Sequence, residues 1–330
     1  MNCPICNCSS SFIKEVKCGN FDQSILYNVV KVNCCDVCGH IFNELTPDDK
    51  INLNTHYLTE YSDCHNFNSH CSENPNILEI NQKDLRKYLT YLTEFNSGKI
   101  NLNKKFDMII LDQLVEHLVN PLCFFNELGH FLKDTGVLKI SCPNSLLYLG
   151  NKLHFPDYNF IIREHIQHFD YTHLVFLLGK CGFSIINVEY DELEIIKNIH
   201  MPNMSLSFIK NKNNNLCIND EFFELKNKIL TSKKGFDYKL ETVDNYYCYG
   251  IGREFLYMLQ NKYFSTIKLL GLIDTTPIKQ KYTINGMEIY SENIIKKLTK
   301  KDTILITAFA HKEKINKKIK TELMFDGTVR

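Results

Sequence analysis

Short apolar runs alternate with segments of helical periodicity through the middle of the chain, between residues 75 and 209. Three of the runs have the composition of buried strands, at 106–111, 137–141 and 183–188. Two segments between them carry apolar residues at helical spacing, at 122–132 and 174–181, and Gly182 follows the second as a cap. This alternation predicts a parallel sheet covered by helices on both faces, which is an α/β fold.

A second alternating block runs from Tyr246 to about Leu323. It has apolar runs at 269–274 and 303–307 and a short hairpin predicted at 284–289. A polar stretch at 210–215 and a predicted helix at 220–233 separate the two blocks. The sequence therefore predicts five segments, which are a cysteine module at 1–45, a linker at 46–74, an α/β domain at 75–209, a hinge and helix at 210–245, and a small Rossmann-like α/β domain at 246–330.

The first α/β block is too short for a complete sheet. Between Leu89 and the strand at Phe106 lie 16 residues, whereas a strand–helix–strand unit needs about 30 or more. We therefore expect a Rossmann-like domain with a truncated parallel sheet, from which at least one strand is missing.

Two Cys-x-x-Cys pairs occupy the N-terminal module: Cys3 with Cys6, and Cys35 with Cys38. Two such pairs form a four-thiolate set, which suits Zn²⁺. Gly39 follows the second pair and Asn7 the first, where a metal-binding turn needs a residue that accepts positive φ.

The alternative to a zinc site is a set of reduced thiols that pack as small hydrophobic side chains. Three spare cysteines, Cys8, Cys18 and Cys34, leave room for a shift in the ligand set. A hairpin at 22–31 could form inside the loop between the two pairs.

Composition predicts a soluble cytoplasmic enzyme. The 330 residues include 38 acidic and 38 basic side chains, a balance that argues against nucleic acid or a membrane surface as partner. Fourteen cysteines without a signal peptide favour metal ligands and free thiols over disulfides. No apolar stretch approaches the ~20 residues that span a bilayer.

Four elements of the middle block occur in a family-like order. They are a strand that begins Phe106-Asp107, then Glu116-His117-x-x-x-Pro121, then Leu132-Lys133-x-x-Gly136, and a strand that ends in Pro143-Asn144. This stretch resembles class I S-adenosylmethionine-dependent methyltransferases. Together with the cysteine module and the C-terminal domain, the chain resembles the sugar C-methyltransferases. The resemblance implies S-adenosylmethionine as cofactor and a nucleotide-linked sugar as substrate, in surface polysaccharide biosynthesis.

The resemblance also implies a catalytic set of Glu164, His165 and His200. The segment 158–169 resembles a family signature in which Glu164 and His165 match the catalytic Glu-His pair. Ile162 stands where the family has a catalytic Tyr, and His200 stands where it has a His. A His beside a carboxylate is a plausible base for removing a proton next to a carbonyl. The alternative is a Glu-His pair that only shapes the edge of a loop.

For the cofactor, the resemblance points to Glu79, Asn81, Asp84, Asp112 and Gln113. The segment 77–85 aligns with the family's acidic glycine-rich turn, with Asn81 and Leu85 in place of its glycines. Ligands of open α/β sheets bind outside the carboxyl ends of the strands.

Two alternatives remain beside this assignment. One is a non-catalytic methyltransferase relative that acts as a binding or partner protein. The other is a separate nucleotide site in the C-terminal domain, with Gly250 and Gly252 at a phosphate and Asp274 at a ribose.

Overall fold

The computed structural model describes residues 1–59, 74–80, 85–98, 104–148, 157–196, 199–211, 217–232 and 245–330. The chain forms two compact units. The first consists of Met1–Glu15 and Lys31–Gly235, and the second of Val16–Val30 and Phe236–Arg330. Both units combine helices with sheets that contain parallel strands, which confirms the predicted α/β class.

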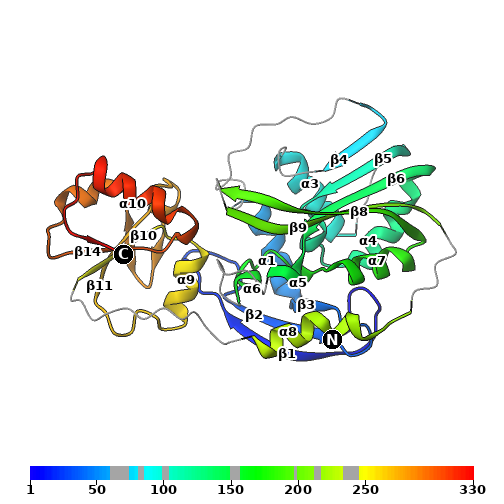
Figure 1. The fold of residues 1–330 in the computed structure, drawn as a ribbon, viewed down its shortest axis with the longest axis horizontal. Helices are drawn as coiled ribbons and strands as arrows, with labels where there is room; N and C mark the ends of the chain where they lie inside the picture. Colours follow the sequence, from blue (N-terminus) through cyan, green and yellow to red (C-terminus); the bar gives the residue numbers. More distant parts are fainter. Residues whose placement is uncertain are drawn as a thin grey trace. The chain divides into compact units, whose positions relative to one another are not determined.

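The main sheet of the first unit has the strand order β4-β5-β6-β9-β8 (Figure 1). The strands are β4 Ile77–Ile80, β5 Phe106–Asp112, β6 Leu132–Pro143, β8 Phe183–Ile196 and β9 Ile199–Lys210. β4, β5 and β6 run parallel as predicted, with Leu111 paired to Ile80 on one side and to Ile140 on the other. All three side chains are buried, as expected of a sheet covered on both faces.

The direction of the strand predicted at 183–188 differs from the prediction. It is the first part of β8, which runs antiparallel to β9, and β9 also runs antiparallel to β6. Only residues 197–198 separate β8 from β9, and consecutive strands joined so closely pair antiparallel. The sequence pattern missed β9 because it contains Pro202, and proline weakens any strand prediction.

A single helix, α3, lies between β4 and β5 in the described residues. Within the same ranges, β5 is the only neighbour of β4, so β4 is an edge strand. The truncated sheet predicted from chain length is therefore confirmed for the part of the chain that the structure describes.

Capping residues fix where the helices of this unit begin. Thr46 and Asp49 form a capping box at the start of α1. The Asn120 side chain accepts from the Cys123 amide at α4, and Asp170 caps α7. The helices are α1 Pro47–Leu58, α3 Leu85–Asn96, α4 Pro121–Leu128, α5 Ser145–Tyr148, α6 Tyr158–Ile161, α7 Tyr171–Lys180 and α8 Glu224–Thr231, with 3₁₀ helices η1 Val115–His117, η2 Gly129–Phe131 and η3 Asp220–Phe223.

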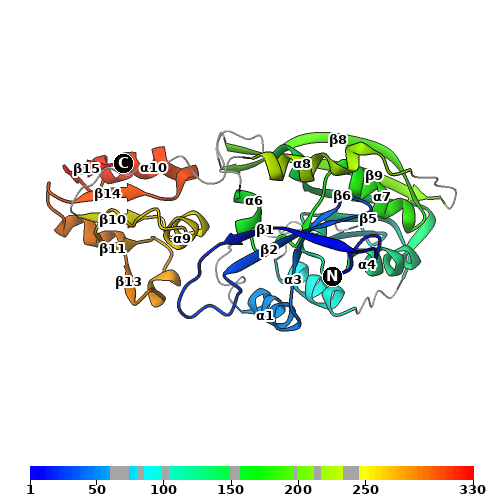
Figure 2. The same cartoon turned by 90° about the horizontal axis from the view of Figure 1, so that it is seen from below.

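The cysteine module contributes three strands to a second sheet, of order β1-β2-β3-β7. The strands are β1 Ser10–Lys17, β2 Val29–Cys35, β3 Ile41–Glu44 and β7 Gln167–His168. β1 and β2 lie side by side in this sheet (Figure 2). β3 pairs antiparallel with β7, which ties the module to the signature segment at 158–169. The hairpin proposed at 22–31 is not formed, since residues 18–28 contain no strand.

The second unit has a sheet of order β12-β13-β11-β10-β14-β15. Its pairings are parallel except in the β12–β13 hairpin, which turns at Asn285 and Gly286. The elements are β10 Tyr246–Tyr249, α9 Arg253–Gln260, β11 Leu269–Ile273, η4 Lys279–Lys281, β12 Thr283–Ile284, β13 Met287–Tyr290, η5 Glu292–Lys297, β14 Thr303–Ile306, η6 Phe309–His311, α10 Lys312–Thr321 and β15 Thr328–Val329.

The loop between β1 and β2 belongs to this second unit. The carboxylate of Asp22 accepts hydrogen bonds from the Thr283 hydroxyl at 2.6 Å and from the amides of Asn285 and Gly286 at 2.9 and 3.0 Å. Asp22 therefore caps the β12–β13 turn. Within the described ranges, no helix combines the length and apolar character needed to cross a membrane.

Candidate functional site

The structure brings Cys3, Cys6, Cys35 and Cys38 together, with their sulfur atoms all within 4.8 Å of one another. The Cys3 and Cys38 sulfurs are 3.8 Å apart, and those of Cys6 and Cys35 are 3.3 Å apart. Sulfur atoms that surround Zn²⁺ at about 2.3 Å stand roughly 3.8 Å from each other. The four residues thus have both the chemistry and the spacing of a closed tetrahedral metal site.

Each Cys-x-x-Cys turn has the backbone that a metal-binding turn requires. Gly39 has a φ of +73° and Asn7 a φ of +63°, as the sequence predicted. The amides of Val37 and Cys38 point at the Cys35 sulfur, at 3.4 and 3.3 Å. Hydrogen bonds from the Cys3 and Cys38 thiols lower the pKa of Cys35.

The spare cysteines do not enter the cluster. The thiol of Cys34 donates to the carbonyl oxygens of Cys35 and Gly39, and those of Cys8 and Cys18 donate to Cys6 and Val16 carbonyls. The predicted ligand set therefore needs no shift in register.

Glu164 and His165 lie in a second cluster, beside His117. The His117 Nδ1 atom is 2.9 Å from the Glu164 carbonyl oxygen, and the two imidazole rings of His117 and His165 meet edge to face at 4.9 Å between centroids. The carboxylate of Glu164 is 3.5 Å from Nε2 of His56. The Tyr57 hydroxyl, fully buried, lies 3.1 Å from Nδ1 of His117.

Three neighbouring segments hold this cluster in place. The amide of Ile166 donates to the Glu116 carbonyl at 2.8 Å, which joins η1 to the signature segment. The Asn43 amide group donates to the carbonyl of His165 at 2.9 Å, and that of Asn96 to the carbonyl of His117 at 3.3 Å. The loop that carries Glu164 and His165 is thus held by β3 and η1, and η1 is held in turn by α3.

Burial governs the ionisation of the two residues on η1. Burial raises the pKa of Glu116 to about 8 and lowers the pKa of His117 to about 4. Both side chains are 2% exposed. In the absence of a cation, this part of the cluster is therefore neutral near pH 7.

Sequence reasoning missed His56, Tyr57, Glu116 and His117 as members of the cluster. Glu116 and His117 were recognised only as part of a fold motif, the Glu-His-x-x-x-Pro turn. The adjacent pair His56-Tyr57 carries no motif, and 60 residues separate Tyr57 from its partner His117. Ile162, in place of the family's Tyr, is buried and offers only its carbonyl, to the amide of His165.

The predicted cofactor residues are only partly described. Glu79 lies half-buried in β4, and Asp112 ends β5, so both stand at or near the carboxyl edge of parallel strands. Asn81 and Asp84 lie outside the described residues. His200 belongs to β9, but its side chain is likewise outside the described part of the structure.

Gln113 follows β5 in a left-handed backbone conformation, with a φ of +52°. The side-chain amide nitrogen of Gln113 donates to Oδ1 of Asn203 at 2.9 Å. The side-chain amide of Asn203 donates in turn to Ser141 and Asp191. The Gln113 side chain is thus hydrogen-bonded to a residue of β9, at the carboxyl end of β5.

In the second unit, the Asp274 carboxylate is bound by neighbouring backbone amides and by a lysine. Its carboxylate accepts from the amides of Ile251 and Thr276, at 2.8 and 2.9 Å, and pairs with Lys279 at 3.0 Å. Both oxygens are therefore occupied, which weakens the alternative in which Asp274 binds a ribose. Gly250 has a φ of +91° and packs against Ala308.

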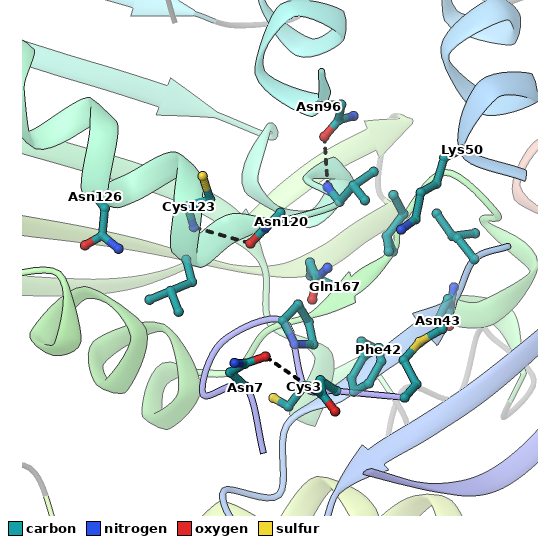
Figure 3. A pocket seen from close by; sticks show the side chains of 17 residues that line it. Cys3, Asn7, Phe42, Asn43, Lys50, Asn96, Asn120, Cys123, Asn126 and Gln167 are labelled. Carbon is teal, nitrogen blue, oxygen red and sulfur yellow. Dashed lines mark hydrogen bonds between the residues drawn. The ribbon is translucent and has the colours of Figure 1, made fainter. Parts of the chain in front are cut away.

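A cavity of about 730 Å³ lies in the first unit beside the cysteine turn (Figure 3). Cys3 and Asn7 line one side, and Asn120, Cys123 and Asn126 of the α4 start line another. Its size falls in the range of small-molecule sites, roughly 300–1,000 Å³.

Comparison with known proteins gives matches among solved structures only. No family model matches the chain, and no curated protein matches it. A methyltransferase from Methanosarcina mazei is 19% identical, covering 41% of this chain and 80% of its own, with a TM-score of 0.29. One from Clostridium acetobutylicum is 10% identical over 41% and 74%, with a TM-score of 0.29. A possible histamine N-methyltransferase from Thermotoga maritima is 14% identical over 48% and 91%, with a TM-score of 0.30. All three are described as S-adenosylmethionine-dependent methyltransferases.

Proposed function

We propose that the chain is an S-adenosylmethionine-dependent methyltransferase that acts on a nucleotide-linked sugar, in surface polysaccharide biosynthesis. The observation that carries this proposal is the cluster of Glu164 and His165 against His117 and Tyr57. The sequence motifs single out the first pair, and the fold adds two further groups able to exchange protons.

The cluster suits transfer of a methyl group to carbon. That reaction needs a base that removes a proton next to a carbonyl, and hydrogen-bond donors that stabilise the resulting enolate. His165 is half-buried and takes the role of base. Glu164 pairs with His56, so its carboxylate fixes the loop on which His165 stands.

The methyl donor is assigned to the carboxyl edge of β4 and β5. Glu79 and Asp112 provide carboxylates there, which suit an ammonium group and ribose hydroxyls. S-adenosylmethionine supplies an electrophilic methyl group when bound. Residues 81 and 84, together with Gln113, complete the set predicted from the sequence.

The four-cysteine cluster is assigned to one structural zinc ion. Its sulfur spacing, the two left-handed turn residues and the amides aimed at Cys35 support this assignment. A cytoplasmic location fits, because reduced thiols persist there.

The second candidate function is a non-catalytic relative that serves as a binding or partner protein. Two observations favour it. The Gln113 side chain is held by Asn203, and β4 has no neighbour beyond β5 among the described strands. A further strand would normally help to hold the ribose.

Calorimetry with S-adenosylmethionine separates the two candidates. An enzyme should bind the cofactor at micromolar to millimolar concentrations, and Asp112→Ala should weaken this binding, whereas Glu127→Ala on the exposed face of α4 should not. If the wild-type chain releases no heat of binding up to millimolar cofactor, the catalytic assignment fails and the non-catalytic one stands.

A further inference from the structure

Three side chains of metal-binding chemistry meet in the first unit, away from the cysteines. They are Glu116, His117 and His165, and one ligand atom from each lies within 4.8 Å of the other two. Glu116 and His117 come from η1, at the end of β5, and His165 comes from the segment that leads into β7. Two are buried and His165 is half-buried, so the group has one side with access.

The hydrogen bonds of His117 decide which of its nitrogen atoms carries a lone pair. Nδ1 lies 2.9 Å from the carbonyl oxygen of Glu164, and a carbonyl oxygen can only accept. Nδ1 therefore bears the proton of the neutral ring, and Nε2 bears the lone pair. A histidine that donates its other ring N–H to a backbone carbonyl has the usual arrangement of a metal ligand.

The lone pair of Nε2 faces a carboxylate. Nε2 of His117 is 3.9 Å from Oε1 of Glu116. When Glu116 is ionised, two acceptors face each other at this distance, which is unfavourable unless a proton or another positive charge lies between them. A cation bound by both atoms would supply it.

Glu116 adds an independent reason to expect a cation. Its side chain is 2% exposed, and neither carboxylate oxygen has a hydrogen-bond partner in another described residue. Buried carboxylates are ordinarily paired, hydrogen-bonded or bound to a metal. Metal binding would replace the proton that a buried carboxyl group otherwise keeps.

We propose that Glu116, His117 and His165 form a second metal site, for a divalent transition-metal ion such as Zn²⁺ or Fe²⁺. Two imidazoles and one carboxylate suit these ions, and three protein ligands leave a coordination position for water or substrate. Ligand atoms about 2.1 Å from an ion stand roughly 3.4 Å apart, so binding draws the three side chains slightly closer together.

This inference goes beyond the proposed methyl transfer and does not depend on it. The two roles of His165 exclude each other: it can act as the proposed base only when the site holds no ion, because the ring nitrogen that binds the ion cannot also accept a proton. An ion at this position could polarise a substrate carbonyl as a Lewis acid.

Cobalt binding by the metal-stripped full chain tests the proposal. The variants are Glu116→Gln, which keeps the shape of the side chain, and Glu127→Gln, a control on the exposed face of α4. The wild type and Glu127→Gln should bind one more equivalent of Co²⁺ than Glu116→Gln. The thiolate-to-cobalt absorption of the four-cysteine site should be equal in all three. Equal cobalt content in all three proteins would overturn the proposal.

A second variant covers the case in which Glu116→Gln fails to fold. His165 is half-buried in a loop, so His165→Ala should fold, and it should lose the same equivalent of cobalt while keeping the thiolate absorption. If His165→Ala retains the full wild-type cobalt content, the site does not exist. Calorimetry with S-adenosylmethionine on the same samples reports the proposed function separately, since it measures cofactor binding rather than metal content.

Discussion

The Nε2 atom of His173 lies 2.9 Å from the carbonyl oxygen of Cys38. His173 belongs to α7, is fully buried, and is held through Nδ1 by Asp170 at 2.8 Å. One imidazole thus connects the second Cys-x-x-Cys turn to a helix of the main α/β fold. The second cysteine turn is therefore stabilised by a hydrogen bond from a residue 135 positions away in the sequence.

We expect His173→Ala to destabilise the first unit by about 2–4 kcal/mol, because it leaves a cavity and removes the imidazole partner of the buried Asp170 carboxylate, which keeps only its hydrogen bond from the backbone amide of residue 173 among those described. Urea unfolding followed by circular dichroism measures the loss. His130→Ala, at an exposed position, should change the unfolding free energy by less than about 0.5 kcal/mol. Equal effects of the two substitutions would show that the connection to Cys38 adds no stability.

Metal analysis should detect one equivalent of zinc that depends on the four cysteines. Cys35→Ser should lose this equivalent, since three thiolates bind the ion much more weakly than four. Cys8→Ser is the matched control, because the Cys8 sulfur is not among the four clustered sulfurs and its thiol donates only to a backbone carbonyl, that of Cys6. A folded wild-type protein without thiolate-bound zinc would contradict the assignment.

Two glycines with the same backbone conformation allow steric and conformational costs to be separated. Gly39 and Gly182 have φ values of +73° and +81°. A Cβ atom at Gly39 would lie 2.1 Å from the carbonyl oxygen of Phe222, whereas one at Gly182 would meet nothing within 4 Å. Gly182→Ala should cost about 1–2 kcal/mol from backbone strain alone. Gly39→Ala should lower the free energy of unfolding by at least about 1 kcal/mol more than Gly182→Ala does. Chemical denaturation measures both losses, and a smaller difference between them would show that Phe222 moves aside.

The Asp22 cap of the β12–β13 turn should respond to pH. The hydrogen bond from Thr283, with those from the Gly286 and Asn285 amides, lowers the pKa of Asp22. A carboxyl group whose pKa is lower in the folded state stabilises the fold at pH values above its unfolded pKa, about 3.9. This stabilisation is lost as the pH falls through the pKa of the folded state. The protection factors of the 285 and 286 amides, which correct for the intrinsic slowing of exchange at low pH, should therefore fall in acid.

Asp22→Asn should remove this acid dependence and lower the melting temperature of the second unit by a few degrees. Asp326→Asn is the control, because the Asp326 carboxylate is 60% exposed and pairs with Lys300 at the surface. It should leave the exchange of the 285 and 286 amides unchanged. If both variants behave alike, general charge and not the cap explains the result.

His165→Ala should reduce methyl transfer by about 10²–10⁴-fold, the usual loss on removing a general base. Tyr57→Phe should have a smaller effect, because it removes one hydroxyl next to His117 and keeps the ring. Rates with a nucleotide-linked keto sugar as acceptor, measured as labelled methyl incorporation, provide the test. An unchanged rate in His165→Ala would exclude it as the base.

The sequence predicted local features well because local residues determine them. Gly39 and Asn7 have positive φ because a Cys-x-x-Cys turn closes there, and Thr303–Ile306 forms a strand because the run is apolar. Chain length alone predicted that at least one strand is missing before β5. Long-range relationships could not be predicted in this way. The contacts of Tyr57 with His117 and of Asp22 with Thr283 join residues 60 and 261 positions apart, and no periodicity encodes them.

The loop at 16–30 makes the second unit discontinuous in sequence. The chain enters this unit within β1, leaves it within β2 and returns after residue 235. A fragment that begins at 236 would lack Asp22 and would leave the β12–β13 turn uncapped. Duplication or exchange of residues 236–330 by a single recombination event would therefore yield an incomplete unit, so the two ends of this protein are expected to be inherited together.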